Sequence, residues 1–340
     1  MKMKKYSPIL AGWLLLLAIQ VYGVTKVGTT AASFLAIDVG PRGTGMGSAY
    51  VSLANDATAM YWNPAGIAKL NRFETTFCNT KWIVDLSFNY VGAVIPFGNL
   101  GNLGVNATFL TMDPIERTTE FYPDGTGEFF DAGSVAFGLS YARNLTDKFA
   151  IGMNAKYINE RMYHSNAYGL ALDFGALYHT GFHGLTFGLS ITNYGTKMRL
   201  DGRDLQVQHD ISPSLNGNNA NINARLLTDR FDLPLMLRTG ISMDVFSGPN
   251  NSKLTIAIDA LHPSDDVEYV NIGGEYTFYD MFFLRAGYKE LFAEASEQGL
   301  SFGGGIHYKV LGTTTLFFDY SYNDLGVFNV IHMFSVGLGL

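Results

Sequence analysis

Two patterns in the sequence contain residue types that carry catalytic or metal chemistry. Ser301 stands in Gly299–Leu300–Ser301–Phe302–Gly303, the G-x-S-x-G pattern of serine nucleophiles, which requires a turn from a strand into a helix. This segment alternates like a strand instead, so we expect no catalytic serine. His179 and His183 are separated by three residues, but they flank a predicted turn and lack a third ligand. We therefore expect both histidines to be solvated.

Two further patterns could bind ions. Asp265, Asp266 and Glu268 offer the oxygen ligands that calcium takes, although a solvated loop is the simpler interpretation. A glycine-rich stretch lacks the preceding strand and the spacing of a dinucleotide-binding loop, and therefore predicts a tight turn. Its residues of interest are Arg42, Gly43, Gly45 and Gly47.

Composition limits the class of protein. The 340 residues carry 23 basic and 30 acidic side chains, and the net charge of −7 excludes a broad phosphate-binding surface. Only 16% of residues are charged, against about 25% in average proteins. Cys78 is the single cysteine, which excludes an intramolecular disulfide framework.

Residues 1–23 are predicted to be a secretory signal peptide. Lys2, Lys4 and Lys5 precede an apolar run, Ile9–Ile19, that is too short to span a membrane, and Gly23 suits cleavage. An uncleaved anchor is the alternative.

Most of the remaining chain alternates with the period of a β-strand. For example, Phe137, Leu139 and Tyr141 alternate with Gly138 and Ser140. One face of such strands is large and apolar, and the other is mostly small or polar. No later stretch offers 18 continuous apolar residues, so a closed barrel is the remaining way for this chain to cross a membrane.

About fourteen such strands can be counted, most of them long enough for a tilted membrane strand. Their large side chains would overfill one barrel if they faced inward, so we expect them to face lipid. The sequence therefore predicts an all-β fold, a transmembrane antiparallel β-barrel of about 14 strands over residues 73–340, integral to a bacterial outer membrane. The predicted strands are 73–82, 86–96, 102–112, 133–143, 149–162, 167–179, 184–194, 233–245, 253–262, 267–279, 281–290, 298–310, 313–323 and 328–340.

The connections between these strands alternate in length. Long ones follow odd-numbered strands, at 113–132, 195–232 and 291–298, whereas most of the others are short. This parity predicts short periplasmic turns, long outer loops and both barrel termini on the periplasmic side. The loop 195–232 could dock a partner or form a lid, or it could have no special role.

Residues 24–72 do not alternate, and we expect them to form a plug inside the lumen. Short helices are predicted over 48–54 and 57–62. Asn63–Pro64 should end the second helix, because proline disfavours helix at the preceding residue, and a further turn is expected at 65–68.

Two motifs in this segment carry a resemblance to a known family. They are residues 36–56, which begin AIDVGPRGTGMGSAYV, and residues 61–66, YWNPAG. The chain resembles the PorV/PorQ family, which is grouped with the FadL-like fatty-acid transporters. The resemblance implies a fourteen-strand outer-membrane barrel with an N-terminal hatch, whose turn of Asn63, Pro64, Ala65 and Gly66 gates the lumen. Pro41 and Ser48 depart from the family pattern, which more often has alanine and glycine there.

The resemblance implies one of two functions, neither of them enzymatic. PorV-like members bind and hand on exported proteins in the type IX secretion route, and this is our prediction. The alternative is a FadL-like channel that takes up hydrophobic small molecules through a hatch-gated lateral opening. No metal or cofactor is expected. The implied partners are outer-membrane lipid, with either exported proteins and secretion subunits or hydrophobic small molecules.

Charged residues at predicted inward positions could form a conduction path, or a polar network that pins the hatch together with Arg42. We favour the network, because both signs of charge occur and a buried charge must be paired or wetted. These residues are Lys156, Asp173, Arg238, Asp244, Asp259, Glu275, Arg285 and Asp319.

Overall fold

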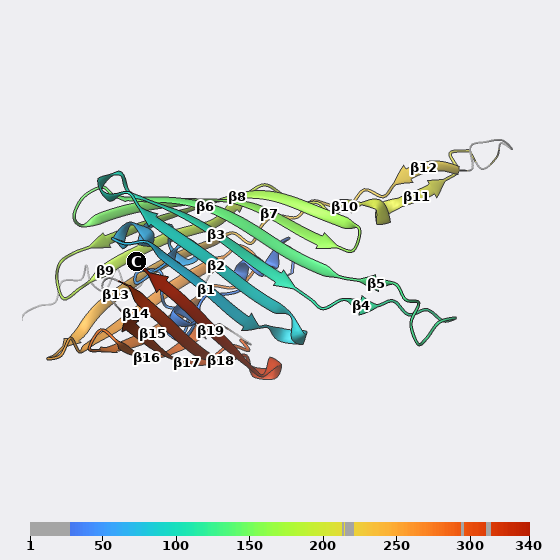
Figure 1. Cartoon of the computed structure of the whole chain (residues 1–340). Helices are drawn as coiled ribbons and strands as arrows, with labels where there is room; N and C mark the ends of the chain where they lie inside the picture. The colour runs from blue at the N-terminus through green and yellow to red at the C-terminus, as the bar shows by residue number, and fades with distance from the viewer. Residues whose placement is uncertain (1–27, 213, 215–220, 294–295, 311–313) are drawn as a thin grey trace, which may run out of the picture.

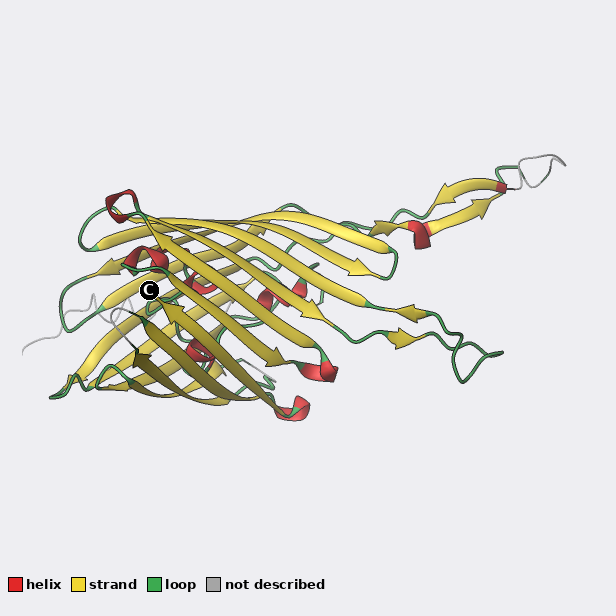
Figure 2. Cartoon of the chain, in the orientation of Figure 1, coloured by secondary structure: helices red, strands yellow, loops and turns green. Residues whose placement is uncertain are grey.

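Fourteen long antiparallel strands form one closed barrel in the computed structural model, which describes residues 28–212, 214, 221–293, 296–310 and 314–340 (Figures 1 and 2). The predicted signal peptide lies outside the described residues. The barrel closes where β1 pairs with β19. All fourteen predicted strands are confirmed, and their ends differ from the predicted ends by at most three residues. The strands are β1 (Glu74–Lys81), β2 (Ser87–Pro96), β3 (Asn102–Thr111), β6 (Ala132–Asn144), β7 (Phe149–Met162), β8 (Ser165–His179), β9 (Thr186–Gly195), β13 (Met236–Ser247), β14 (Lys253–Pro263), β15 (Tyr269–Phe278), β16 (Phe282–Leu291), β17 (Leu300–Lys309), β18 (Thr315–Asp324) and β19 (Val330–Gly339).

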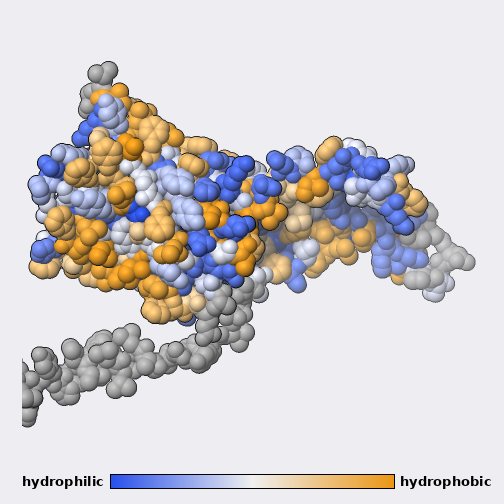
Figure 3. Space-filling view, turned by 90° about the horizontal axis from the view of Figure 1, so that it is seen from below, coloured by the Kyte–Doolittle hydropathy of each residue, from blue (hydrophilic) through white to orange (hydrophobic). Residues whose placement is uncertain are grey.

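The large apolar face of the strands points outward. In β6, Phe137, Leu139 and Tyr141 are 51%, 59% and 43% exposed, whereas Ala136 and Ser140, which belong to the alternate positions, are buried. Seen from below in Figure 3, the barrel wall carries large patches of apolar side chains, and hydrophilic side chains gather on the projecting loops. No helix among the described residues is long and apolar enough to cross a membrane.

The two ends of the barrel differ in their connections, as the parity predicted. One end, which we call the turn end, carries the short connections 97–101, 145–148, 180–185, 248–252 and 279–281, together with both ends of the barrel's chain. The opposite end, the loop end, carries the connections 112–131 and 196–235. Short hairpins project from it, as Figure 1 shows. Their strands are β4 (Ile115–Glu116) with β5 (Phe129–Phe130) and β11 (Gln206–His209) with β12 (Ile222–Arg225), whereas β10 (Asp201–Gly202) pairs with the end of β8.

Residues 28–73, the N-terminal segment, run between the two walls of the barrel (blue in Figure 1). At the loop end, Thr30 forms a bridge with Asp232 and donates a hydrogen bond to Asp265. The segment then crosses to the turn end, where it enters β1. Its elements are η1 (Ser33–Ala36), α2 (Pro41–Thr44), α3 (Ala59–Trp62) and η2 (Pro64–Lys69). The other short helical turns lie in connections: η3 (Ile83–Asp85), η4 (Gly98–Leu100), η5 (Arg203–Leu205) and η7 (Gly326–Phe328).

The predicted helix over 48–54 is wrong. Gly47 and Ser48 both have a left-handed backbone, with φ of 62° and 61°, so a right-handed helix cannot begin there. The predicted break at Asn63 is confirmed: its φ is −158°, and Pro64 opens η2.

Glycines on the inner face of the wall make room for this segment. A Cβ at Gly152 of β7 would lie 2.4 Å from the carbonyl carbon of Pro64, and one at Gly287 of β16 would lie 2.2 Å from that of Met46. On β9, a Cβ at Gly188 would lie 2.7 Å from the carbonyl oxygen of Val51. The backbone of the N-terminal segment is therefore in direct contact with strands all around the barrel.

Candidate functional site

The turn at Asn63 is wedged against β7 and β8. The Asn63 side chain is fully buried and donates to the carbonyl oxygens of Val51 (3.0 Å) and Ala176 (3.1 Å), while its oxygen accepts from Ala65 N–H. Ala65 and Gly66 are buried behind it. Because every polar atom of the side chain is used and Pro64 sits over Gly152, this turn is an anchor in the observed state.

Arg42 connects the N-terminal segment to a chain of charges on the barrel wall. Its Nε and Nη2 atoms each lie 3.0 Å from an oxygen of Glu275 on β15. Glu275 also accepts from Arg285 Nε at 2.7 Å, and Arg285 Nη1 donates to Asp319 at 2.6 Å. His307 lies 3.5 Å from the second oxygen of Asp319. Four of these groups therefore form one paired network that includes three of the predicted lumen charges.

The remaining predicted lumen charges lie elsewhere. Lys156 pairs with Asp173 at 2.9 Å, and Asp173 also accepts from the Asn193 amide. Arg238 packs over the rings of Tyr61 and Trp62 of the N-terminal segment. The last two are Asp259, which accepts from the Val51 amide at 2.8 Å, and Asp244, near the turn end, where Thr255 donates to it.

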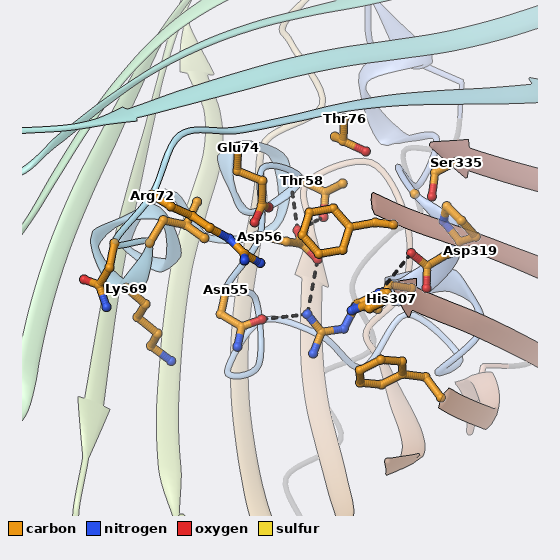
Figure 4. A pocket seen from close by; sticks show the side chains of 17 residues that line it. Asn55, Asp56, Thr58, Lys69, Arg72, Glu74, Thr76, His307, Asp319 and Ser335 are labelled. Carbon is orange, nitrogen blue, oxygen red and sulfur yellow. Dashed lines mark hydrogen bonds and ion pairs between the residues drawn. The ribbon is translucent and has the colours of Figure 1, made fainter. Parts of the chain in front are cut away.

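A cavity of about 520 Å³ opens at the turn end, between the N-terminal segment and strands β1 and β16 to β19 (Figure 4). Its polar side carries Arg42, Asn55, Asp56 and Lys69, and Arg42 donates to Asn55 at 2.6 Å. Its wall side carries the aromatic rings of Phe283 and Phe317. The barrel side also carries Glu74, His307 and Asp319, so charged and polar groups line the turn-end cavity on both sides, with two aromatic rings among them.

Lys69 and Asp38 are among the ionisable groups of the N-terminal segment whose pKa values are shifted. Burial, with Arg42 and Lys253 nearby, lowers the pKa of Lys69 to about 8. No acceptor contacts its ammonium in the part of the chain that the structure describes. Burial acts to raise the pKa of Asp38, but the ammonium of Lys289 at 2.6 Å and a hydrogen bond from Ser48 hold that pKa below its ordinary value.

A second cavity, of about 210 Å³, lies toward the loop end along the same wall. It is lined by Asp38, Thr44 and Gly47 of the N-terminal segment and by Trp82, Leu325 and Met333 of the barrel. We call it the loop-end pocket.

The helix α2 and the turn after it separate the two cavities. Gly40, Pro41 and Arg42 border the turn-end cavity, whereas Thr44 and Gly47 border the loop-end pocket. We call α2 and this turn the partition. On the loop-end side, few hydrogen bonds hold the partition to the wall. Thr44 Oγ1 lies 2.8 Å from Ser321 Oγ, and the Gly47 amide donates to Ser301 Oγ at 2.8 Å.

The structure shows where the other residues singled out in the sequence lie. Ser301 lies within strand β17 and accepts from Gly47, so it is a contact of the N-terminal segment. Gly43 packs against Trp62, and Gly45 approaches Gly303, so the glycine-rich stretch is a close-packed turn. His179 lies beside Thr186 at the turn end, and His183 lies in the connection 180–185. Asp265 accepts from Thr30, and no group of three metal-binding side chains occurs among the described residues.

Sequence reasoning missed the partition itself. Thr44 and Ser321 are ordinary hydroxyl residues, and nothing in their spacing indicates that they meet. A signal was present in the glycines: the 38 glycines include many at inward positions of alternating strands, where close backbone approach is the usual reason for glycine.

Solved structures show what this arrangement resembles. The fold is that of FadL-like outer-membrane channels. The CymD monoaromatic hydrocarbon channel matches with a TM-score of 0.56 at 13% identity, covering 88% of this chain and 96% of that chain. The Ralstonia pickettii toluene transporter TbuX gives 0.52 at 12%, covering 88% and 97%. A Pseudomonas aeruginosa FadL homologue gives 0.54 at 12%, covering 93% and 99%.

The FadL-like fold confirms the predicted fold class, a fourteen-strand barrel of the outer-membrane type. No family model matches the chain, and no curated protein matches its sequence significantly. The resemblance to PorV/PorQ therefore stays a prediction. Two of the matching structures are described as a monoaromatic hydrocarbon channel and a toluene transporter, and at this identity the match establishes the shared fold.

Proposed function

We propose that the chain is an outer-membrane channel for the uptake of small hydrophobic molecules. The observation that carries this proposal is the pair of cavities on one wall, with only α2 and its following turn between them. The fold is shared with a monoaromatic hydrocarbon channel and a toluene transporter, which supports the substrate class.

The proposed route follows strands β16 to β19. A molecule enters the loop-end pocket among Trp82, Leu325 and Met333, whose side chains are largely apolar. It passes α2 when Thr44 and Gly47 part from the wall, and it reaches the turn-end cavity beside Phe283 and Phe317. Its passage needs no removal of the whole N-terminal segment.

In this proposal the moving part of the hatch is α2, and the turn of Asn63, Pro64, Ala65 and Gly66 stays fixed. The turn is buried against β7 and β8, on the other side of the N-terminal segment from both cavities. By contrast, α2 borders a cavity on each side, so it has space to move once its ion pair with Glu275 and its hydrogen bonds to the wall open.

The test is uptake of radiolabelled toluene by bacterial cells that express the full chain. We expect uptake several-fold faster than in cells without it. Asn323 faces the loop-end pocket, so Asn323→Trp should fill the pocket and abolish most of the gain. Thr126→Trp, on the exposed connection between β4 and β5, is the matched control and should leave uptake unchanged. Uptake no faster than in cells lacking the chain would refute the proposal.

A further inference from the structure

The loop-end pocket has the size of a single aromatic ring with a small substituent. Its volume is about 210 Å³. An apolar cavity of about 150 Å³ is large enough to hold benzene. The apolar side chains that line the pocket are Ile37, Trp82, Leu325, Ile331 and Met333, and the last four pack together as one cluster. The body of a one-ring molecule therefore has an apolar surface to lie against.

The same pocket also contains a lysine with unused hydrogen-bond donors. Lys289 of β16 borders the pocket, and its ammonium lies 2.6 Å from Asp38 Oδ2. A carboxylate oxygen of Glu290 lies 4.0 Å away, which is too far for a hydrogen bond. An ammonium has three N–H donors. Because Asp38 is the one acceptor within reach among the described residues, Lys289 has donors left for a molecule in the pocket.

Asp38, by contrast, has both of its oxygens in use. Its Oδ2 accepts from Ser48 at 2.6 Å as well as from Lys289, and its Oδ1 accepts from the Tyr61 hydroxyl at 3.3 Å. Three donors therefore hold this carboxylate, and the carboxylate in turn holds the ammonium of Lys289 at the edge of the pocket.

Two side-chain amides supply acceptors to the same pocket. Gln298 borders it, and its side chain forms no hydrogen bond with any described residue. Asn323 also borders it and donates through Nδ2 to Ser321 at 3.0 Å, which leaves its Oδ1 free of described partners. A hydroxyl group both accepts and donates a hydrogen bond. Lys289 can donate to its oxygen, and either amide oxygen can accept its hydrogen.

Charge in the pocket decides between a hydroxyl group and other polar groups. Two carboxylates, Asp38 and Asp324, border the pocket together with the single ammonium of Lys289. A ligand carboxylate would therefore enter an environment of net negative charge, and a ligand ammonium would lie beside another ammonium. A bare hydrocarbon would displace water from the unused donors of Lys289 and leave them unpaired, which is costly for a charged group. A phenol is neutral at pH 7 and avoids all three penalties.

We propose that the loop-end pocket selects one-ring molecules that carry a neutral hydroxyl group, that is phenols, over hydrocarbons of the same shape. The ring lies among Trp82, Leu325 and Met333, and Lys289 donates to the hydroxyl oxygen. This inference rests on the proposed function, because it names the substrate class that the entry pocket of the proposed route prefers.

The first test is competition against the uptake of radiolabelled toluene by cells that express the full chain, with cells lacking the chain as the baseline. p-Cresol and p-xylene have nearly the same shape, since one carries a hydroxyl group where the other carries a methyl group. Because a hydrogen bond to a charged group separates them, p-cresol should act at about a tenfold lower concentration than p-xylene. The anion p-toluate should be the weakest competitor.

A double variant removes the ammonium and its counter-charge together. Lys289→Met with Asp38→Asn should make p-cresol and p-xylene equal competitors. Lys156→Met with Asp173→Asn is the matched control, because this ion pair of 2.9 Å joins β7 and β8 and borders neither cavity. The control should keep the preference for p-cresol. Loss of the preference in both variants would show that Lys289 is not its source.

The second test uses the wild-type chain in lipid vesicles and does not depend on uptake. A bromine atom quenches the fluorescence of a tryptophan that it contacts, so ligands in the loop-end pocket should quench Trp82. Quenching should be half-complete at about a tenfold lower concentration of 4-bromophenol than of 4-bromotoluene. Quenching that remains in Trp82→Phe gives the background from the rest of the chain.

The outcomes separate this inference from the proposed function. If the wild-type chain takes up toluene but the paired ligands compete and quench at equal concentrations, the inference is wrong and the proposed function still stands. Stronger competition by p-toluate than by p-cresol would overturn the inference as well, because it would show an anion site. If the wild-type chain takes up no toluene, the proposed function is wrong, and the route on which the inference rests is lost with it.

Discussion

At the scale of single residues, Arg42 is the strongest link between the N-terminal segment and the wall. It forms a two-point contact with Glu275, which in turn holds Arg285. A buried carboxylate that loses one cationic partner keeps its desolvation cost, and breaking such pairs typically costs about 3–5 kcal/mol. On the turn-end side, α2 is therefore held to the wall by an ion pair. On the loop-end side, it and the following turn are held by hydroxyl and amide hydrogen bonds.

Replacing Arg42 should lower the stability of the folded chain and weaken the contact that keeps α2 against the wall. We expect Arg42→Met to lower the free energy of unfolding by about 3 kcal/mol and to raise the rate of toluene uptake. Arg117→Met is the control, because Arg117 pairs with Glu128 on a projecting hairpin with both side chains more than half exposed, where such pairs contribute about 0–1 kcal/mol. Thermal unfolding in detergent measures the first effect. Equal losses for the two variants would contradict the account.

The lowered pKa of Lys69 predicts that the stability of the folded chain depends on pH. Its pKa is about 8 in the folded chain against 10.5 for an ordinary lysine, so the unfolded state binds the extra proton more tightly. Stability from this group is therefore lowest below pH 8 and rises as the pH goes from about 8 to 10.5. Lys69→Met should raise the unfolding midpoint at pH 7 and make little difference near pH 10.5. The same gain at both pH values would show that charge is not the cause.

At the scale of elements, the backbone of the N-terminal segment lies directly against the backbone of the barrel strands. The strands have glycine where the segment passes, which is why so short a segment can touch several strands at once. The alternation of large and small residues predicted each strand, but it did not predict which small positions face the segment. That information depends on the path of residues 28–73, which local periodicity does not encode.

Adding one carbon at such a contact should therefore be costly. Gly152→Ala places a Cβ 2.4 Å from Pro64, and overpacking of this kind typically costs about 1–3 kcal/mol. Gly274→Ala, whose Cβ would meet only the carbonyl oxygen of Thr255 at an ordinary 3.7 Å, should change the unfolding midpoint little. Heat-dependent migration on electrophoresis measures both. Equal midpoints would mean that the segment yields easily at this contact.

At the scale of the whole molecule, the sequence predicted the barrel well and the site poorly. Period-two alternation, strand length and the parity of the connections are local or additive signals, so fourteen strands and their direction could be predicted. The cavities depend on contacts such as Thr44 with Ser321, which are 277 positions apart. A network of inward charges with Arg42 was predicted, but which of these groups pair, as Arg42 does with Glu275, required the fold.

The measurement that tests the account most directly uses a reversible disulfide bond, here called a lock, that holds α2 against the wall. In a Cys78→Ser background, Thr44→Cys with Ser321→Cys joins α2 to β18, because the two native hydroxyl oxygens are 2.8 Å apart. A lock between strands, Asn79→Cys with Asn89→Cys, is the control, since these residues pair on β1 and β2 away from both cavities. The account predicts that the oxidised α2 lock stops toluene uptake, that reduction restores it, and that the control lock has no effect. Undiminished uptake with α2 locked would contradict a route past this helix.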